Sequence, residues 1–384
     1  MLRIINYIKE NGLAKTIENF KLKIKVYDKK ILLKYDQIES DMSYPEVQEC
    51  RGLILERDTW NVMCMSFKKF FNNGEPHASR IDWGTAIVLE KLDGTMIQVY
   101  YDWHKEKWFA ATTGMAEGEG EVNNKNGTTF NELFWETLDR LSFDRGKLHR
   151  GFTYVFELTT PYNIVVKPHG TSTVTLLSIR DNQILTEFKY DELVAVGGYF
   201  NLPVVKSFSL TENSVAEITK TFEDMPWSEE GYVVVDKEFN RIKIKNPAYV
   251  AVHHLKAKTA EHNILTIVKS NEIEEFAATF PERKEELYEL KINFDNLISK
   301  LIKAWMELFD HRPKDNSAAE KKKFALSVFD VAKKYDLEQF TGLFFALQNG
   351  KVEHIYQYML KYDDKKLYKI LKNEKWSLSV NTSL

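Results

Sequence analysis

Four short segments in a fixed order along the chain carry residue types that could transfer a nucleotide. In order, they are Lys91-Leu92-Asp93-Gly94, Phe156-Glu157, Glu230-Gly231-Tyr232 and Lys243-Ile244-Lys245. They supply an amine that can attack phosphorus, two carboxylates that can hold a ribose or a divalent ion, and paired cations for a polyphosphate. These groups are what the transfer of a nucleoside monophosphate through a lysine adduct requires. A lone Lys-x-Asp-Gly is common by chance, so the prediction depends on all four segments together.

Lys91 follows a predicted strand and precedes a predicted turn. Residues 86–90, which end at Glu90, and residues 95–101 have the apolar composition of strands. We expect Asp93 and Gly94 to form the turn between them, because glycine accepts a positive φ freely. Lys91 would then be a nucleophile at the edge of a cleft, with Glu90, Asp93 and Gly94 in the same nucleotide site. The alternative is a plain hairpin with an exposed lysine.

The paired lysines lie on a predicted amphipathic strand, residues 241–245. Side chains alternate between the faces of a strand, so Ile242 and Ile244 should pack inward while Arg241, Lys243 and Lys245 share the other face. Two ammonium groups about 6.6 Å apart along a strand can straddle a polyphosphate and stabilise the charge that grows on it. The alternative is an ordinary strand with a solvated face.

The two glutamates lie on or beside apolar strands. Glu157 alternates with aromatic residues over residues 152–159, and Glu230 precedes the run 232–235. A carboxylate in such surroundings is costly unless it is paired or bound to a metal. Each glutamate alone is more often a salt-bridge partner, but together with the lysines they predict a metal–phosphate site.

The order of these segments resembles the covalent nucleotidyltransferases, which include ATP-dependent ligases and messenger-RNA capping enzymes. Flanking segments narrow the resemblance to RNA ligases of the phage T4 RNA ligase 1 type. The similar segments are residues 49–54 (Glu-Cys-Arg-Gly-Leu-Ile), 68–72 (Lys-Lys-Phe-Phe-Asn), 152–161, 175–180 and 230–249.

The resemblance implies a role for each matching residue. Lys91 would form a covalent lysyl-AMP, and Lys243 and Lys245 would hold the α-phosphate. Glu157 and Glu230 would contact the ribose and the metal ion. The remaining nucleotide contacts would come from Arg51 and Lys69 at the phosphates, from Phe71 as their support, and from Leu177 and Val233 on either side of the adenine.

Two segments depart from the family pattern. Residues 111–114 (Ala-Thr-Thr-Gly) are neutral where the family places basic residues before a glycine, and residues 163–166 (Asn-Ile-Val-Val) lack the family's arginine. These differences concern the expected contacts to RNA ends more than adenylylation. Lys167 could replace one of the missing charges.

Composition agrees with an intracellular enzyme. The chain has 384 residues, a net charge of −3 and two cysteines, Cys50 and Cys64. Two cysteines argue against a disulfide framework, and a slightly acidic chain needs local basic patches to bind RNA. Because there is no long apolar run and no signal-peptide pattern at the start, we expect a soluble, cytoplasmic protein, in the host cytoplasm if it is viral.

The predicted fold class is α+β, with an antiparallel-sheet nucleotidyltransferase domain over residues 1–255 and an all-α domain over residues 256–384. Short alternating strands dominate the first part, with a helix around residues 131–138. After Pro281 the apolar spacing becomes helical, and Ser317-Ala318-Ala319-Glu320 predicts a capping box before a helix that includes Phe324, Val328 and Ala332. A further helix is expected over residues 352–360.

We therefore expect an ATP-dependent RNA ligase that uses Mg²⁺, with Mn²⁺ able to substitute. AMP would pass from Lys91 to a 5′-phosphate RNA end, and a 3′-hydroxyl end would displace it. The helical tail would position a structured RNA such as broken tRNA, and we expect a monomer without membrane attachment. The alternatives are a DNA-joining or RNA-capping nucleotidyltransferase, which usually continues into a small β-barrel, and a non-catalytic RNA-binding relative. Intact Lys91, Lys243 and Lys245 argue against the last.

Overall fold

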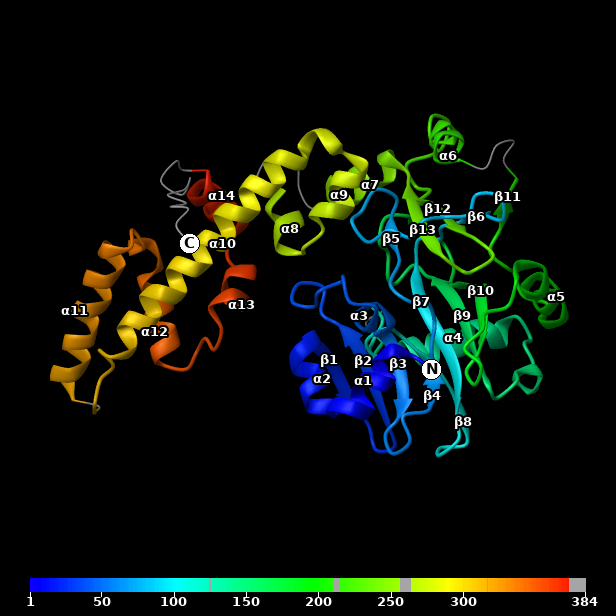
Figure 1. Ribbon diagram of the computed structural model, residues 1–384, viewed down its shortest axis with the longest axis horizontal. Coiled ribbons are helices and arrows are strands. Elements are labelled where there is room, and N and C mark those ends of the chain that lie inside the picture. Colours follow the sequence, from blue (N-terminus) through cyan, green and yellow to red (C-terminus); the bar gives the residue numbers. More distant parts are fainter. Residues whose placement is uncertain (124–125, 210–213, 256–263, 316, 373–384) are drawn as a thin grey trace. The chain divides into compact units, whose positions relative to one another are not determined.

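The computed structural model describes residues 1–123, 126–209, 214–255, 264–315 and 317–372 (Figure 1). The chain divides into two compact units, Met1–Lys256 and Ala257–Leu384. The first contains all the strands of the described residues, and the second is helical. The predicted α+β class is therefore confirmed.

The first sheet of the Met1–Lys256 unit is antiparallel, in the order β1-β2-β3-β4. Its strands are β1 (Leu22–Val26), β2 (Lys30–Tyr35), β3 (Arg51–Glu56) and β4 (Val62–Cys64). The helices α1 (Arg3–Asn11), α2 (Leu13–Phe20) and α3 (Pro45–Glu49) share its apolar core, which includes Ile4, Ile8, Leu33 and Leu53. Cys50 and Cys64 are both buried and free, as expected for a chain without a disulfide framework.

The second sheet has the order β10-β9-β7-β8 and is also antiparallel. Its strands are β7 (Thr95–Asp102), β8 (Lys107–Ala111), β9 (Phe152–Thr159) and β10 (Thr173–Asp181). The elements α4 (Phe130–Arg140), η1 (Arg145–Lys147) and α5 (Tyr190–Phe200) accompany it. Tyr154, Phe156 and Leu158 of β9 lie in its core with Phe134 of α4, so the aromatic face predicted for this strand is confirmed.

The third sheet has the order β11-β6-β12-β13-β5. Its strands are β5 (Phe71–Asn72), β6 (Ile87–Glu90), β11 (Ser207–Phe208), β12 (Gly231–Val235) and β13 (Arg241–Lys245), with α6 (Val215–Thr221) nearby and α7 (Pro247–Leu255) following. β5 pairs with β13 in parallel, and the other pairs are antiparallel. Ile242 and Ile244 are buried in the core, which confirms the predicted inward face of β13.

The chain passes from the third sheet to the second at residues 91–94. β6 and β7 belong to different sheets, so the hairpin alternative is wrong. We also expected a positive φ at Gly94, and this prediction is wrong, because the φ of Gly94 is not positive. A Cβ at this position would lie 2.6 Å from the carbonyl oxygen of Leu158, so glycine is needed for the close approach to β9. This crossing places Lys91 between two sheets.

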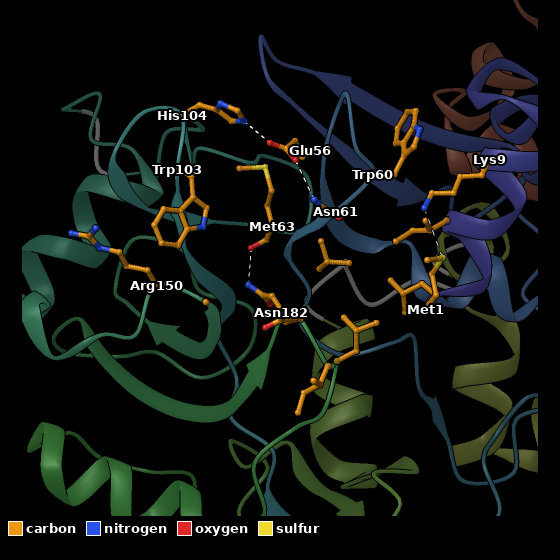
Figure 2. Close-up of a pocket in the computed structure, with 17 residues that line it drawn as sticks. Met1, Lys9, Glu56, Trp60, Asn61, Met63, Trp103, His104, Arg150 and Asn182 are labelled. Carbon is orange, nitrogen blue, oxygen red and sulfur yellow. Dashed lines mark hydrogen bonds and ion pairs between the residues drawn. The ribbon is translucent and has the colours of Figure 1, made fainter.

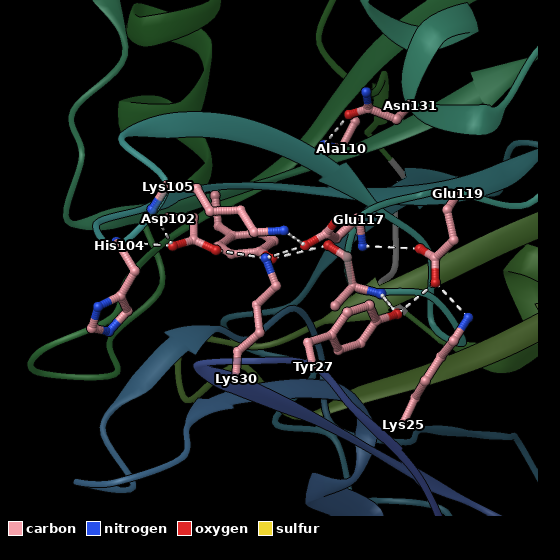
Figure 3. Close-up of polar contacts among 12 residues, drawn as sticks. Lys25, Tyr27, Lys30, Asp102, His104, Lys105, Ala110, Glu117, Glu119 and Asn131 are labelled. Atoms are coloured by element: carbon pink, nitrogen blue, oxygen red, sulfur yellow. Dashed lines mark hydrogen bonds and ion pairs between the residues drawn. The ribbon is translucent and has the colours of Figure 1, made fainter.

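A buried polar cluster joins the first sheet to the second (Figure 3). Lys30 of β2 is 1% exposed, and its Nζ lies 2.5 Å from Asp102 Oδ2 and 3.0 Å from Glu117 Oε1. The same ammonium lies 4.1 Å from the centroid of the Phe109 ring. At the edge of the cluster, the Tyr27 hydroxyl donates to Glu119. A buried lysine needs such partners, because an unpaired buried charge is costly.

The Ala257–Leu384 unit consists of helices among its described residues. They are α8 (Ile264–Lys269), α9 (Ile273–Thr279), η3 (Pro281–Arg283), α10 (Lys284–Phe309), α11 (Ala318–Lys334), η4 (Glu338–Phe340), α12 (Thr341–Gln348), α13 (Ile355–Leu360) and α14 (Asp364–Leu371). The predicted apolar stripe of α10 is buried, including Leu287, Leu290 and Leu301. Within the described ranges, no helix is long and apolar enough to cross a membrane.

Half of the predicted capping box of α11 is present. Ser317 Oγ accepts a hydrogen bond from Glu320 N at 3.3 Å, as predicted. The Glu320 carboxylate does not return a bond to Ser317 but accepts from Lys314 N at 3.1 Å. The helix expected from residue 352 begins at Ile355 instead.

Candidate active site

Lys91 lies immediately after β6, and its backbone is fixed by the neighbouring strand. Its N–H donates to the carbonyl of Gly231 at 2.9 Å, next to the point where β12 begins. Its Nζ lies 2.7 Å from Glu230 Oε1, and its side chain is 20% exposed. The amine predicted as nucleophile is therefore partly accessible and held by one predicted acid.

Glu230 brings two of the predicted lysines together. Besides Lys91, its Oε1 lies 3.4 Å from Lys245 Nζ. The pairing of β12 with β13 explains this geometry, since Gly231 is directly opposite Lys245. Gly231 has a φ of 124°, and a Cβ there would lie 2.3 Å from the carbonyl oxygen of Ile244. Only glycine permits this close pairing beside Glu230.

Glu157 projects from β9 into the same region. Burial, followed by repulsion from Glu230 and Asp93, raises the pKa of Glu157 to about 8, although Lys91 and Arg51 partly oppose the shift. The carboxyl therefore keeps its proton to a higher pH than an exposed glutamate does. A carboxyl shifted this far by burial and a nearby acid is typical of a functional site.

Arg51 reaches the site because of an irregularity in the first sheet. Gly52, with a φ of 75°, follows it at a register shift between β2 and β3. Such bulges re-aim side chains and are common beside active sites. The Arg51 guanidinium lies 5.2 Å from the Phe70 ring, and its buried Nη1 has no hydrogen-bond partner. An unsatisfied buried donor of this kind fits an anionic ligand.

These groups line a cavity of about 240 Å³. Seven of the predicted residues line it: Arg51, Glu90, Lys91, Gly94, Glu157, Leu177 and Val233. Leu177 is the unpaired residue of a second bulge, where the register of β9 and β10 shifts between Leu176 and Ser178. The lining of the cavity thus combines apolar residues of two sheets with charged residues that include Lys91 and Glu157.

Six predicted residues lie outside the lining of this cavity: Lys69, Phe71, Asp93, Glu230, Lys243 and Lys245. Lys69 Nζ lies 5.4 Å from the Phe71 ring, which fits the predicted supporting role of that ring. The parallel pair β5–β13 sets Phe71 opposite Ile242 and Asn72 opposite Lys243. Phe71 therefore lies on the edge strand β5, next to the strand that carries the paired lysines.

The Asp93 carboxylate is hydrogen-bonded by other groups of the protein. Its Oδ2 accepts from the backbone N–H groups of Val166 and Lys167, and its Oδ1 accepts from the Tyr249 hydroxyl at 2.9 Å. His169 Nε2 lies 2.9 Å from the Asp93 carbonyl oxygen. Asp93 thus anchors the loop after β9 and the helix α7 beside Lys91, which favours a positioning role over direct contact with a nucleotide.

Sequence reasoning missed several residues of the site. Phe67, Phe70 and Met96 line the cavity but carry no local signal of that role, and Arg241 lines it as well. Buried Tyr249, whose pKa is raised by burial and by the nearby acids Glu230 and Asp93, contacts the Lys-x-Asp-Gly segment from far along the chain. Only the alternation in residues 241–245 could have indicated Arg241, since it shares a face with the paired lysines.

The segments that depart from the family pattern have local partners. Asn163 Nδ2 donates to Thr95 Oγ1 at 2.6 Å, and Lys167 Nζ lies 2.8 Å from Glu229 Oε1. Lys167 is therefore near the site, because its backbone also contacts Asp93.

The residues present fit a divalent ion together with a nucleotide. No group of three or more histidine, cysteine or acidic side chains close enough to hold a metal is found in the part of the chain that the structure describes. Mg²⁺ usually binds one or two carboxylates plus substrate phosphates, and it keeps several waters. Glu157 and Glu230, close enough for one to raise the pKa of the other, can supply those oxygens.

Comparisons with known proteins identify the family of the chain. A model of the T4-type RNA ligase family, described as RNA ligase, matches residues 49–249, more than half of the chain. An RNA ligase of Rhodothermus phage RM378 is 26% identical over 374 residues, covering 79% of this chain and 82% of that protein. A putative bifunctional polynucleotide kinase/RNA ligase of Autographa californica nuclear polyhedrosis virus is 30% identical over 315 residues, which are 74% of this chain but 42% of that protein.

A solved structure of an archaeal ATP-dependent RNA ligase aligns with a TM-score of 0.48 and 14% identity, covering 88% of this chain and 82% of that one. The family match includes Arg51, Lys91, Glu157, Glu230 and Lys245. The chain therefore belongs to the RNA ligase family and is an enzyme of that class.

Proposed function

We propose that the protein joins RNA ends with ATP, through a lysyl-AMP and then an RNA-adenylate. The observation that supports this best is the Lys91–Glu230–Lys245 contact beside the cavity. In the first step the Lys91 amine forms a bond to the α-phosphorus of ATP, and the bond to the β-phosphate oxygen breaks to release pyrophosphate. AMP then passes to the 5′-phosphate of one RNA, and the 3′-hydroxyl of another displaces it.

Charged side chains around Lys91 would support the formation of lysyl-AMP. The Lys91 amine must lose its proton before it attacks. Glu230 Oε1 lies 2.7 Å from the Lys91 amine and 3.4 Å from Lys245 Nζ, so it holds both nitrogens close together. Once a nucleotide is bound, Lys243, Lys245 and the unsatisfied Arg51 donor would stabilise the charge on its phosphates.

The cavity would bind the adenine, and the carboxylates would bind the metal ion. The apolar walls at Leu177 and Val233 would hold the adenine, and the lysines outside the lining would meet the triphosphate. Glu157 and Glu230 would hold Mg²⁺, or Mn²⁺ in its place, and the bound ion would neutralise charge on the phosphates. Because the raised pKa of Glu157 favours its protonated form, binding of the ion there would weaken as the pH falls.

We assign adenylylation to residues 1–255 and selection of a structured RNA, such as broken tRNA, to the helical residues 256–384. All the groups proposed for nucleotide chemistry lie in the Met1–Lys256 unit. The proposed substrates are RNA ends that carry a 5′-phosphate and a 3′-hydroxyl, and the proposed working form is a monomer.

The decisive test is to compare two donors in the joining reaction. The wild-type protein should join a 5′-phosphate RNA when ATP and Mg²⁺ are supplied. Lys91→Ala should lose this activity but still join an RNA that has been adenylylated chemically, because the last step needs no lysine nucleophile. Failure of the wild-type protein to join either donor, or joining of 5′-phosphate RNA by Lys91→Ala, would overturn the proposal.

A further inference from the structure

A second cavity in the Met1–Lys256 unit is larger than the nucleotide cavity (Figure 2). Its volume is about 590 Å³, against about 240 Å³, and the two linings share no residue. It is lined by α1, by the turn between β3 and β4, and by residues next to the ends of β7, β9 and β10. Its volume lies within the range of about 300–1,000 Å³ that is usual for ligand pockets.

Tryptophans stand on opposite sides of this second cavity in Figure 2, Trp103 on one side and Trp60 on the other. Trp103 is 59% exposed. Trp60 and Leu185, which also lines the cavity, have φ values of 63° and 62°. Bulky residues rarely adopt this left-handed conformation, and such strain collects at functional sites. The cavity thus offers flat aromatic surface to solvent.

Lys9 and Arg150 give the second cavity a positive charge. Within the described ranges, neither side chain forms an ion pair with a carboxylate. The Arg150 guanidinium lies 4.6 Å from the Tyr101 ring and 5.9 Å from the Trp103 ring. Among the described residues that line the cavity, the only acid is Glu56, whose Oε1 lies 2.6 Å from His104 Nε2. Cations beside exposed aromatic rings are the combination that binds single-stranded nucleic acid.

Strands of the second sheet run from one cavity to the other. On β7, Met96 lines the nucleotide cavity, and Trp103 follows the far end of the strand. On the neighbouring strand β9, Glu157 lines the nucleotide cavity and Gly151 precedes the opposite end. Strands rise by about 3.3 Å per residue, so roughly 20 Å of sheet separates the two cavities.

We propose that the second cavity binds a single-stranded segment of the RNA substrate, with a base stacked on Trp103 and phosphates beside Lys9 and Arg150. This inference rests on the proposed function, because it takes RNA as the substrate. Stacked nucleotides in a strand advance by about 3.4 Å each, so about six would be needed to cover 20 Å. The second cavity should therefore act on long RNA and not on very short RNA.

The test uses the full-length protein and single-stranded RNAs of 12 and 4 nucleotides with a 5′-phosphate. Binding of the fluorescent 12-mer is measured by anisotropy as a function of salt, and the KM for joining is measured for both lengths. The variants are Trp103→Ala and the double variant Lys9→Ala/Arg150→Ala. The matched control is Tyr199→Ala/Lys147→Ala, because Tyr199 is exposed, Lys147 Nζ lies 4.7 Å from its ring, and both residues lie outside both cavities.

Trp103→Ala should weaken 12-mer binding at least about fivefold, as expected when one base–aromatic stack is removed. Removing two cations should reduce the salt slope by about 0.7 for each RNA phosphate that the protein no longer neutralises. The KM for the 12-mer should rise while that for the 4-mer, and lysyl-AMP formation, stay unchanged.

Binding of the 12-mer at wild-type strength by both cavity variants would overturn the inference, as would an equal loss of binding in the control variant. Lysyl-AMP formation is measured separately in the wild-type protein. If no adduct forms but the variants still lose RNA binding, the proposed reaction fails while the assignment of the second cavity stands.

Discussion

At the residue scale, Glu230 contacts the amines of both Lys91 and Lys245. This contact predicts that Lys245 acts on the nucleotide phosphates, unlike a lysine that only faces solvent. Lys245→Ala should slow lysyl-AMP formation roughly 100- to 1,000-fold, since it removes a charged contact to a developing phosphoryl charge. The rate is measured with ATP labelled at the α-phosphate. Lys237→Ala is the matched control, because Lys237 is an exposed lysine in the turn between β12 and β13. Equal rates in both variants would mean that Lys245 takes no part.

Glu157 gives a pH-dependent prediction. Its pKa is raised to about 8 in the folded protein, mainly by burial. The folded state therefore keeps a proton that the unfolded state loses above a pH of about 4.3, so this group lowers the stability as the pH rises to about 8. Glu157→Gln should become more stable than the wild-type protein over that window, with no further gain above it.

The difference is measured by thermal unfolding from pH 5 to pH 9, with a chelator present and no nucleotide. Glu132→Gln is a suitable control, since Glu132 lies on the surface at the N-terminus of α4. A constant difference between wild type and Glu157→Gln at all pH values would contradict the raised pKa.

At this scale, strand alternation was sufficient to predict which way Glu157, Ile242 and Ile244 face. It could not indicate that Tyr249 contacts Asp93 or that Phe70 lines the cavity beside Arg51, because both contacts join segments that are apart in the sequence. The same limit applies to Asp93, whose partners are backbone groups of a loop some 70 residues later. Local periodicity contains no information on such pairs.

The element scale shows how the sheets are held against one another. Lys30 on β2 bonds to Asp102 at the end of β7, with both side chains buried. Removing one partner of a buried ion pair typically costs about 3–5 kcal/mol, because the other charge is left uncompensated. Lys30→Ala should therefore lower the free energy of unfolding by about that amount, as measured by urea denaturation.

Its neighbour provides the control. Lys29 forms an exposed pair with Asp58 at 3.7 Å, so Lys29→Ala should change the stability by less than about 1 kcal/mol. A similar small effect in both variants would show that the cluster in Figure 3 contributes little to the joint between the sheets.

Strands β9 and β13 begin and end where the alternating pattern predicted. The division of β6 and β7 between two sheets was not predictable from it, because an Asp-Gly turn signal is common to hairpins and crossings. The bulges at Gly52 and Leu177 could not be predicted from the sequence pattern either. They depend on the pairing register, which is set by packing across the sheet.

For the whole molecule, the division at Lys256 allows the two proposed roles to be tested separately. A chain of residues 1–255 should still form lysyl-AMP but join structured RNA more weakly than the full chain. Its folding is confirmed first by circular dichroism and by a cooperative thermal transition. A folded fragment that forms no adduct would show that the helical unit completes the nucleotide site, and unchanged joining of structured RNA would assign that unit to another partner.

The most direct test of the central claim is to identify the residue that carries the nucleotide. The protein is incubated with ATP labelled at the α-phosphate and Mg²⁺, digested, and the labelled peptide is sequenced by mass spectrometry. We predict one AMP on the amine of Lys91 and no covalent label in Lys91→Ala. Label on another residue, or a labelled Lys91→Ala protein, would contradict the assignment of Lys91 as the nucleophile.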